Sequence, residues 1–354
     1  MEIEFVTPPP SALESLGISP SKIDAIRAWI EERADGEGRG YLVQIWCRGA
    51  DIISAAGGTV GTGANVVQLH RDSIIPLASN TKSITAAAAF VLVERGLLAL
   101  DTRVQEFFPD LLGRGKEAIT VHHLLTHTSG IEDERVHSLA ASTGRLSPGG
   151  TRMVDISRED VVSLVGEMNL THYPGTQVAY SNFAFWLIGE IVEQLTEMAF
   201  EDFCAAHLFA PLRMVDTSFE LAANGRFVDT GAPHGHGLTG TRLEPWAAGG
   251  AMATMSDMVR FSRMLLGGAG GLNHRVLTEA SVRDDQIAGR SNAVARVLRE
   301  AARWSRCGLR LVRSWHETLR PRAGLAQQFR PCRQFGYKPR RRSRSRDSRF
   351  LIQP

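Results

Sequence analysis

The chain has 354 residues, of which 43% are apolar, and it carries a formal net charge of +2. This much apolar sequence can form a large core, which excludes a disordered protein and suits either two lobes or one large domain. The longest apolar run, Ile84 to Val93, is about half of the roughly 20 residues that a membrane helix needs, so we expect no transmembrane helix.

The N-terminus and the cysteines bear on the location of the protein and on metal binding. Met1 to Pro10 shows no basic start, apolar stretch or cleavage site of a secretory signal, and this favours a cytoplasmic location. The cysteines lack the spacing of a metal site and are too few for a disulfide framework in a chain this long. We therefore expect neither a metal nor a cofactor. The cysteines are Cys47, Cys204, Cys307 and Cys332.

The first elements that the pattern predicts are a helix and a hairpin. Lys22 to Ala34 has isoleucines at helical spacing, at positions 23, 26 and 30, which predicts an amphipathic helix. Tyr41 to Cys47 and Asp51 to Ala56 are two short strand-like runs, and Gly49 between them suits a turn. We expect these two runs to pair as an antiparallel hairpin.

The middle of the chain is mainly helical by pattern. Ser79 to Arg95 is apolar on all sides in its middle and is followed by Gly96, which predicts a buried helix with a glycine stop. Four further helices are expected, separated by loops with glycine and proline. They are Arg158 to Glu167, Phe183 to Leu195, Phe200 to Leu208 and Ser256 to Leu266.

The segment Ser79-Asn80-Thr81-Lys82 carries the first chemical signal. Residues three apart in a helix share one face, so the amine of Lys82 is expected beside the hydroxyl of Ser79. A serine hydroxyl becomes a good nucleophile when a neighbouring base takes its proton, and a lysine in a crowded apolar site has a lowered pKa. The alternative interpretation is an exposed N-cap serine followed by a surface lysine.

The second chemical signal is Tyr180-Ser181-Asn182, directly before the helix predicted from Phe183. If Tyr180 lies beside Lys82, its phenolate can act as a general base, and the amide of Asn182 can bind substrate and the lysine. The alternative interpretation is a helix start with a core tyrosine and Asn182 as N-cap.

Together these motifs resemble the serine β-lactamase and penicillin-binding-protein superfamily. The text around Ser79 is similar to the nucleophile segment of class C β-lactamase-like hydrolases, in which Tyr-x-Asn replaces Ser-x-Asn. The resemblance covers about residues 15 to 280 and continues in three further segments. They are His123 to Ile131, Phe209 to Phe219 and Ala248 to Thr254.

The resemblance implies an α/β fold of the β-lactamase/transpeptidase type, with an antiparallel sheet flanked by helices and a central helical lobe. It implies that Ser79, Lys82 and Tyr180 are catalytic, that Asn182 binds substrate, and that an acyl-enzyme forms on Ser79. The substrate would be a small-molecule ester, lactone or amide, and an esterase is favoured because no secretory signal is seen. No membrane partner is expected.

The family pattern is not complete in this sequence. After Thr254 the resemblance implies a Lys-Thr-Gly, Lys-Ser-Gly or His-x-Gly triad on a strand that supplies the second oxyanion N–H, and none occurs there. His234-Gly235-His236-Gly237 precedes the Ala248 segment and is interpreted as a loop. Losing one oxyanion donor typically costs about 100- to 1,000-fold in rate, so whether this copy is an active enzyme stays open.

The last part of the chain differs sharply in charge. Residues 290–354 hold 18 basic and 3 acidic residues, and 17 of the basic residues are arginines. We expect a hydrolase domain over residues 1–283, lacking its last strands, and a disordered Arg-rich tail over 284–354. A shifted reading frame explains the charge, the lost periodicity and the missing triad together. A tail that binds nucleic acid is the less favoured alternative, and a non-catalytic binding protein is another.

Overall fold

A computed structural model of the chain describes a series of segments that together form the fold. They are residues 4–34, 40–61, 66–146, 156–220, 225–228, 247–265, 276–278 and 281. The Arg-rich tail and the loop around His234 and His236 lie outside these segments, so the expectations for both stay predictions. Among the described residues, no helix is both long and apolar enough to cross a membrane.

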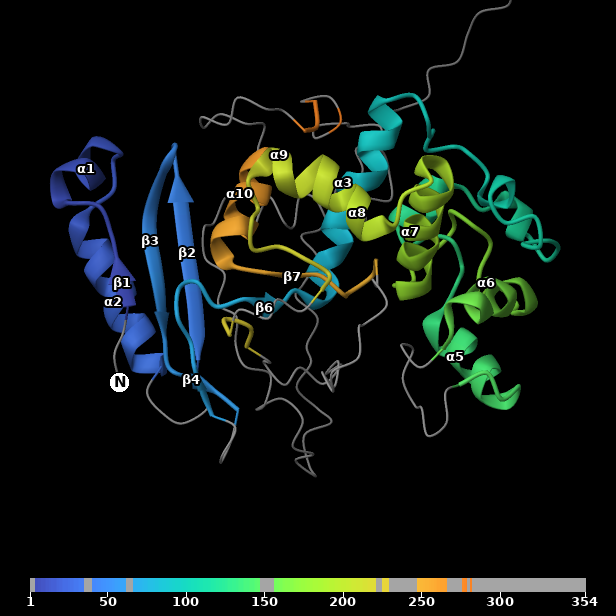
Figure 1. Cartoon of the computed structure of the whole chain (residues 1–354), viewed down its shortest axis with the longest axis horizontal. Helices are drawn as coiled ribbons and strands as arrows, with labels where there is room; N and C mark the ends of the chain where they lie inside the picture. The colour runs from blue at the N-terminus through green and yellow to red at the C-terminus, as the bar shows by residue number, and fades with distance from the viewer. Residues whose placement is uncertain are drawn as a thin grey trace, which may run out of the picture. The chain divides into compact units, whose positions relative to one another are not determined.

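The N-terminal part forms a three-stranded antiparallel sheet covered by two helices (Figure 1). β2 (Tyr41–Cys47) and β3 (Ala50–Gly57) form the predicted hairpin, and β1 (Glu4–Val6) pairs with the other edge of β3, giving the order β1-β3-β2. α1 (Pro10–Ser15) and α2 (Pro20–Ala34) pack on one face of this sheet. The predicted helix and hairpin are confirmed.

The core on that face is built from alternating strand residues and one side of α2. Val43, Ile53 and Ala55 on the strands meet Ile23 and Ile30 on the helix, and all five are at most 4% exposed. On the opposite face α10 (Met255–Leu265) packs against β2, where the Arg263 guanidinium lies 4.9 Å from the Trp46 ring. The sheet is thus covered by helices on both faces.

Two further strand pairs are formed by strands of two residues each. β4 (Thr59–Val60) pairs with β5 (Val67–Gln68), and β6 (Ile75–Pro76) pairs with β7 (Met252–Ala253). The second pair brings the segment before Ser79 beside a segment about 180 residues later in sequence, with Ile75 opposite Ala253 and Pro76 opposite Met252. It therefore helps to assemble the predicted site.

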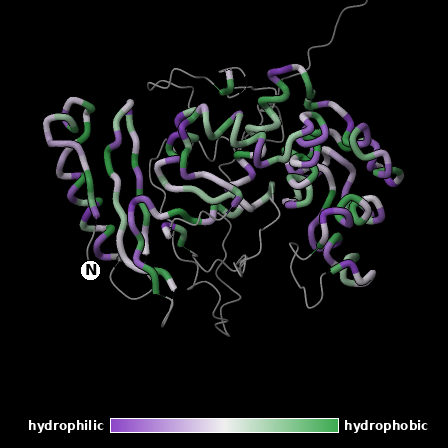
Figure 2. The backbone as a smooth tube through the Cα atoms, viewed as in Figure 1, coloured by the Kyte–Doolittle hydropathy of each residue, from purple (hydrophilic) through white to green (hydrophobic). Residues whose placement is uncertain are grey.

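The central helical part is organised around α3 (Thr81–Glu94) and α7 (Asn182–Thr196), which pack against each other. Figure 2 shows hydrophobic colour along both of these helices, whereas the outer helices α5 (Asp133–Ser142) and α6 (Arg158–Glu167) carry many hydrophilic residues. The remaining helical elements surround this pair. They are η3 (Val104–Glu106), η4 (Lys116–Ala118), α4 (Val121–Leu125), α8 (Phe200–Cys204), the π-helical η6 (Ala205–Phe209) and α9 (Ala210–Leu212).

The predicted helices are present, with differences at their ends. Ser79 lies in a 3₁₀ turn, η2 (Ala78–Asn80), and the α-helix begins at Thr81 rather than at Ser79. α7 begins at Asn182, and its N-cap is Ser181, whose Oγ accepts a hydrogen bond from the N–H of Ala184 at 3.1 Å. The interpretation of Asn182 as N-cap is therefore wrong, because the neighbouring serine caps the helix.

Candidate active site

The turn before α3 presents the hydroxyl of Ser79 to solvent. Ser79 is exposed, whereas Lys82, three residues later, is only 1% exposed. Ala78, directly before the serine, has φ 46°, a left-handed conformation that costs a residue with a Cβ roughly 1 kcal/mol. The sharp entry places Ser79 at the surface and turns Lys82 into the protein.

The structure brings Ser79, Lys82 and Tyr180 into direct contact. The Oγ of Ser79 lies 2.7 Å from the Oη of Tyr180 and 3.3 Å from the Nζ of Lys82. The Nζ of Lys82 also lies 4.8 Å from the centre of the Tyr180 ring. The interpretation of Lys82 as a surface lysine is wrong, because the amine is buried against the serine.

Two oxygens that can only accept hydrogen bonds hold the amine of Lys82. Its Nζ donates to the Oδ1 of Asn182 at 2.5 Å and to the main-chain oxygen of Ala248 at 2.7 Å. Burial lowers the pKa of Lys82 from its usual value of 10.5 to about 7, and the negative charge of Asp133 opposes this change. At neutral pH a large fraction of Lys82 is therefore a neutral amine.

Tyr180 and His127 form a neutral aromatic pair beside the lysine. Burial raises the pKa of Tyr180, the hydrogen bond with Ser79 lowers it, and the charge of Asp133 raises it again, so the net pKa is above the usual 10. The His127 ring lies 4.6 Å from the Tyr180 ring, and burial lowers the pKa of His127 to about 4. At neutral pH the phenol is protonated and the imidazole is uncharged.

Asp133 was not among the predicted site residues, although it is the first residue of α5 and follows the His123 to Ile131 segment. Its carboxylate accepts hydrogen bonds from the Oγ of Ser181 at 3.0 Å, the N–H of Asn182 at 2.9 Å and the Nδ2 of Asn182 at 2.8 Å. A weaker bond comes from the N–H of Phe183 at 3.3 Å. A single acid thus holds the whole start of α7.

The segment from Ala247 to Thr254 lies along the start of α3 and is fixed to it by main-chain atoms. The Oγ1 of Thr85 donates to the oxygen of Ala247 at 2.5 Å, and the N–H of Ala251 donates to the Oγ1 of Thr81 at 3.1 Å. These bonds hold the oxygen of Ala248 against Lys82. Sequence reasoning missed this contact, because a main-chain oxygen has no residue signature.

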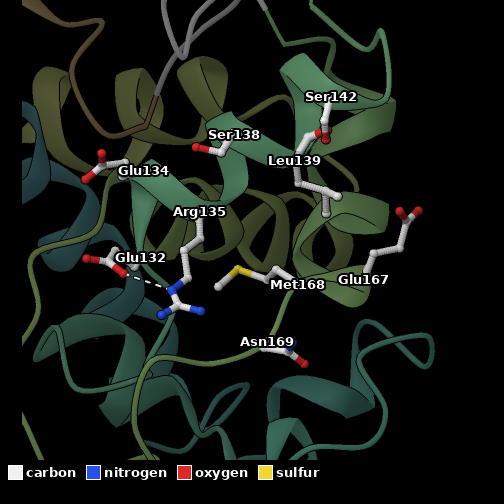
Figure 3. Close-up of a pocket in the computed structure, with 9 residues that line it drawn as sticks. All are labelled: Glu132, Glu134, Arg135, Ser138, Leu139, Ser142, Glu167, Met168 and Asn169. Atoms are coloured by element: carbon white, nitrogen blue, oxygen red, sulfur yellow. Dashed lines mark hydrogen bonds and ion pairs between the residues drawn. The ribbon is translucent and has the colours of Figure 1, made fainter.

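The structure also contains an open hollow along α5, whose lining residues include none of the predicted catalytic residues. Figure 3 shows Arg135 in the hollow, with its guanidinium paired to Glu132 at 3.2 Å. Glu134 points away to one side in this view. The nine lining residues are Glu132, Glu134, Arg135, Ser138, Leu139, Ser142, Glu167, Met168 and Asn169.

Comparison with protein families gives one match over most of the chain. The model of the family described as Beta-lactamase matches residues 26–319, which runs past the expected domain boundary at 283. Protein Rv1367c of Mycobacterium tuberculosis (strain ATCC 25618 / H37Rv) is 31% identical over 245 residues, which are 61% of this chain and 60% of that protein. Esterase EstB of Burkholderia gladioli is 34% identical over 164 residues, which are 45% of this chain and 42% of that protein.

A solved structure shows the same fold. EstCE1, described as a hydrolase with promiscuous acyltransferase activity, superposes with a TM-score of 0.58 and 17% identity over 77% of this chain and 76% of that chain. The fold is therefore of the β-lactamase/transpeptidase type, as the sequence predicted. The chain spans less than two thirds of the length of the two relatives named above.

Proposed function

Because the chain belongs to the beta-lactamase family, we propose that it is a serine hydrolase that forms an acyl-enzyme on Ser79 with a small-molecule ester, lactone or amide. The observation that carries this proposal is the contact between Ser79 and Lys82. An exposed hydroxyl lies 3.3 Å from a buried amine whose pKa is about 7. A nucleophile and a base with a pKa near the working pH are the two groups that acyl transfer needs first.

The hydrogen bonds of Lys82 favour the amine as the base. A neutral amine has two N–H bonds and one lone pair, and the oxygens of Asn182 and Ala248 can only accept hydrogen bonds. When both N–H bonds point to these oxygens, the lone pair is left to face the Oγ of Ser79. Lys82 can then take the proton while Oγ attacks the carbonyl carbon.

Tyr180 suits the second proton transfer. Its phenol is protonated at neutral pH because its pKa is raised, and its Oη lies 2.7 Å from the Oγ of Ser79. We infer that it donates a proton to the leaving oxygen or nitrogen as the tetrahedral intermediate collapses, and that Lys82 replaces this proton. Water then attacks the acyl-enzyme with the same groups acting in reverse.

The oxyanion of the tetrahedral intermediate needs N–H donors close to the reacting carbon. We propose that the N–H of Ser79 is one donor, since it lies in the turn that begins the helical segment. The family resemblance implies a second donor on a strand after Thr254, where this sequence has no matching triad. The names of the relatives favour an ester as the first substrate to test, because EstB is an esterase and EstCE1 a hydrolase with acyltransferase activity.

The test is covalent labelling of Ser79. A fluorophosphonate probe should phosphonylate the Oγ of Ser79 with loss of fluoride, and mass spectrometry of the peptides should locate the adduct. Ser79→Ala should abolish the label, whereas Ser83→Ala, which changes a buried serine on α3, should keep it. A label that persists in Ser79→Ala would disprove the assignment of the nucleophile. A folded protein that the fluorophosphonate does not label would instead favour a non-catalytic binding protein.

A further inference from the structure

Asp133 contacts the catalytic segment without touching the reacting atoms. Its two carboxylate oxygens accept from four donors on Ser181, Asn182 and Phe183, at 2.8 to 3.3 Å. A carboxylate offers only acceptors, so the side chain of Asn182 must turn its NH₂ group toward Asp133. The carbonyl oxygen of the same amide then faces Lys82, as the 2.5 Å bond from Nζ shows.

This orientation decides what Lys82 can do. With the amide oxygen facing it, Lys82 donates an N–H to Asn182. The neutral amine then has its lone pair available for the hydroxyl of Ser79, whose Oγ lies 3.3 Å from Nζ. With the amide reversed, the NH₂ group of Asn182 would face Nζ and donate to the lone pair. The amine would then be occupied by the wrong partner.

We propose that Asp133 is a positioning residue, which fixes the orientation of the Asn182 amide and thereby directs the lone pair of Lys82 at Ser79. The final step of this proposal, in which the lone pair of Lys82 acts on Ser79, rests on the function proposed above. Asp133 itself makes no contact with the carbonyl under attack in this scheme, because its partners are all at the start of α7.

Capping of α7 accounts for only part of these contacts, namely the bonds from the N–H groups of Asn182 and Phe183. Ser181 already caps the helix, since its Oγ accepts from the N–H of Ala184 at 3.1 Å. An acid near a helix N-terminus is stabilising through its charge alone, and that effect needs no bond to a side-chain amide. The 2.8 Å bond from the Nδ2 of Asn182 therefore points to a role in orienting the site.

Three described ionisable groups face Lys82 from three different parts of the chain. Asp133 comes from α5, Tyr180 from the segment before α7, and His127 from the loop after α4. The phenol and the imidazole are both neutral at pH 7. Asp133 is thus the negative charge that favours protonation of Lys82 among these three, and removing it should lower the pKa of Lys82.

The experiment is Asp133→Asn in the full chain, measured by the rate of fluorophosphonate labelling at Ser79 from pH 5 to pH 10. The new amide presents an NH₂ group to Asn182, which favours the reversed orientation. We expect the maximal labelling rate to fall about 10- to 100-fold, at most the lower limit of the roughly 100- to 10,000-fold that a general base typically contributes, because Lys82 is misdirected and not removed. The pH at which labelling rises to half its maximum should also move to lower pH.

The matched control is Glu134→Gln, which removes the same charge from the same first turn of α5 at an exposed position. Its labelling rate and its pH profile should equal those of the unchanged protein, because water screens an exposed charge. A purely structural role of Asp133 predicts a smaller folded fraction with an unchanged pH midpoint. That result in Asp133→Asn would overturn the proposal.

A second readout needs no reaction at all. The chain has four lysines, so a sample labelled with ¹³Cε-lysine gives few signals, and Lys82 is the one missing from Lys82→Ala. Its titration should move to lower pH in Asp133→Asn and stay in place in Glu134→Gln. If the unchanged protein is not labelled at Ser79, the proposed hydrolase function fails. The lysine titration still shows whether Asp133 acts on Lys82.

If Asp133→Asn does not fold, a double variant that exchanges the side chains at positions 133 and 182 tests the proposal. The double variant Asp133→Asn, Asn182→Asp keeps the net charge and a complementary contact, but places the carboxylate directly against Nζ. Lys82 should then titrate at higher pH than in the unchanged protein. An unchanged titration in the folded double variant contradicts the proposal.

Discussion

The burial of Lys82 lowers the stability of the folded protein. Lys82 is 1% exposed, and its amine lies between α3, on which it stands, the start of α7 and the segment at Ala248. Burying an ammonium group without an ionic partner in direct contact disfavours the charged form, and the protein responds by lowering the pKa of Lys82 to about 7. The property that makes Lys82 a suitable base therefore also reduces stability below that pH.

The free energy of unfolding should depend on pH because the charged form of Lys82 is disfavoured in the folded protein. Below pH 7 Lys82 is protonated in both the folded and the unfolded chain, and the cost is constant. Between pH 7 and about 10.4 the unfolded chain binds more protons than the folded one, so the free energy of unfolding rises with pH. Relative to Lys82→Met, the unchanged protein should gain up to about 1.4 kcal/mol per pH unit across this window.

Urea unfolding of both proteins at pH 7, 8, 9 and 10 measures this difference. Lys22→Met is the matched control, because it removes a lysine that is exposed at the start of α2. A flat difference for Lys82→Met would show that the pKa of Lys82 is not lowered in the folded state.

At the scale of single residues, the sequence was sufficient for the groups that lie close in the chain. Ser79 and Lys82 are three positions apart, and helical geometry alone predicts their contact. Asp133 was not predicted because its partners lie about 50 residues away, and an acid at the start of a helix is common. The contact of Lys82 with Ala248 could not be predicted either, since any residue supplies a main-chain oxygen.

At the scale of elements, the site depends on how closely α7 approaches the segment that begins at Ala247. Gly189 on α7 permits this approach, because a Cβ added there would lie 2.7 Å from the Cβ of Ala247. That distance is shorter than any normal carbon contact, so one of the two backbones would have to move. The neighbouring oxygen of Ala248 is a partner of Lys82, and such a movement reaches the catalytic amine.

Gly189→Ala should therefore destabilise the protein, although glycine to alanine in a helix usually stabilises by about 1 kcal/mol. Overpacking costs about 1 to 3 kcal/mol, so we expect a net loss of roughly 1 kcal/mol together with slower labelling of Ser79. Gln194→Ala, at an exposed position of the same helix, should change neither the stability nor the labelling rate of Ser79 by much. Equal or higher stability of Gly189→Ala, measured by thermal unfolding, would contradict the close contact.

Elements with a long periodic pattern were predicted well. The helices from Lys22, Arg158 and Phe183 and the hairpin from Tyr41 all lie within a few residues of their predicted bounds. The pairing of β6 with β7 was not predicted, because strands of two residues carry no periodic pattern. The 3₁₀ turn at Ser79 was missed for a similar reason, since three residues do not distinguish it from the start of the following helix.

At the scale of the whole molecule, the arrangement of the N-terminal sheet matters most. In the order β1-β3-β2, β3 is paired on both sides, whereas β2 has a strand partner on one side only among the described residues. α10 packs against a face of β2, and no strand of the described segments lies at its free edge. The two hypotheses for residues 284–354, a shifted frame and a basic tail, stay predictions, and the match of the family model up to residue 319 includes part of that region.

An edge strand of seven residues that lacks a second strand partner within the described part of the chain is a template for pairing with another chain, so we expect the protein to self-associate through Tyr41 to Cys47. In hydrogen exchange at low concentration, alternate amides of β2 should exchange quickly, because in an antiparallel edge strand every second N–H points away from its partner. The amides of β3 serve as the internal control and should be protected throughout. As the protein concentration rises, the exposed amides of β2 should become protected while light scattering reports larger particles. Protection of all β2 amides that is independent of concentration would show instead that another segment of the same chain covers this edge, and the expected self-association would be wrong.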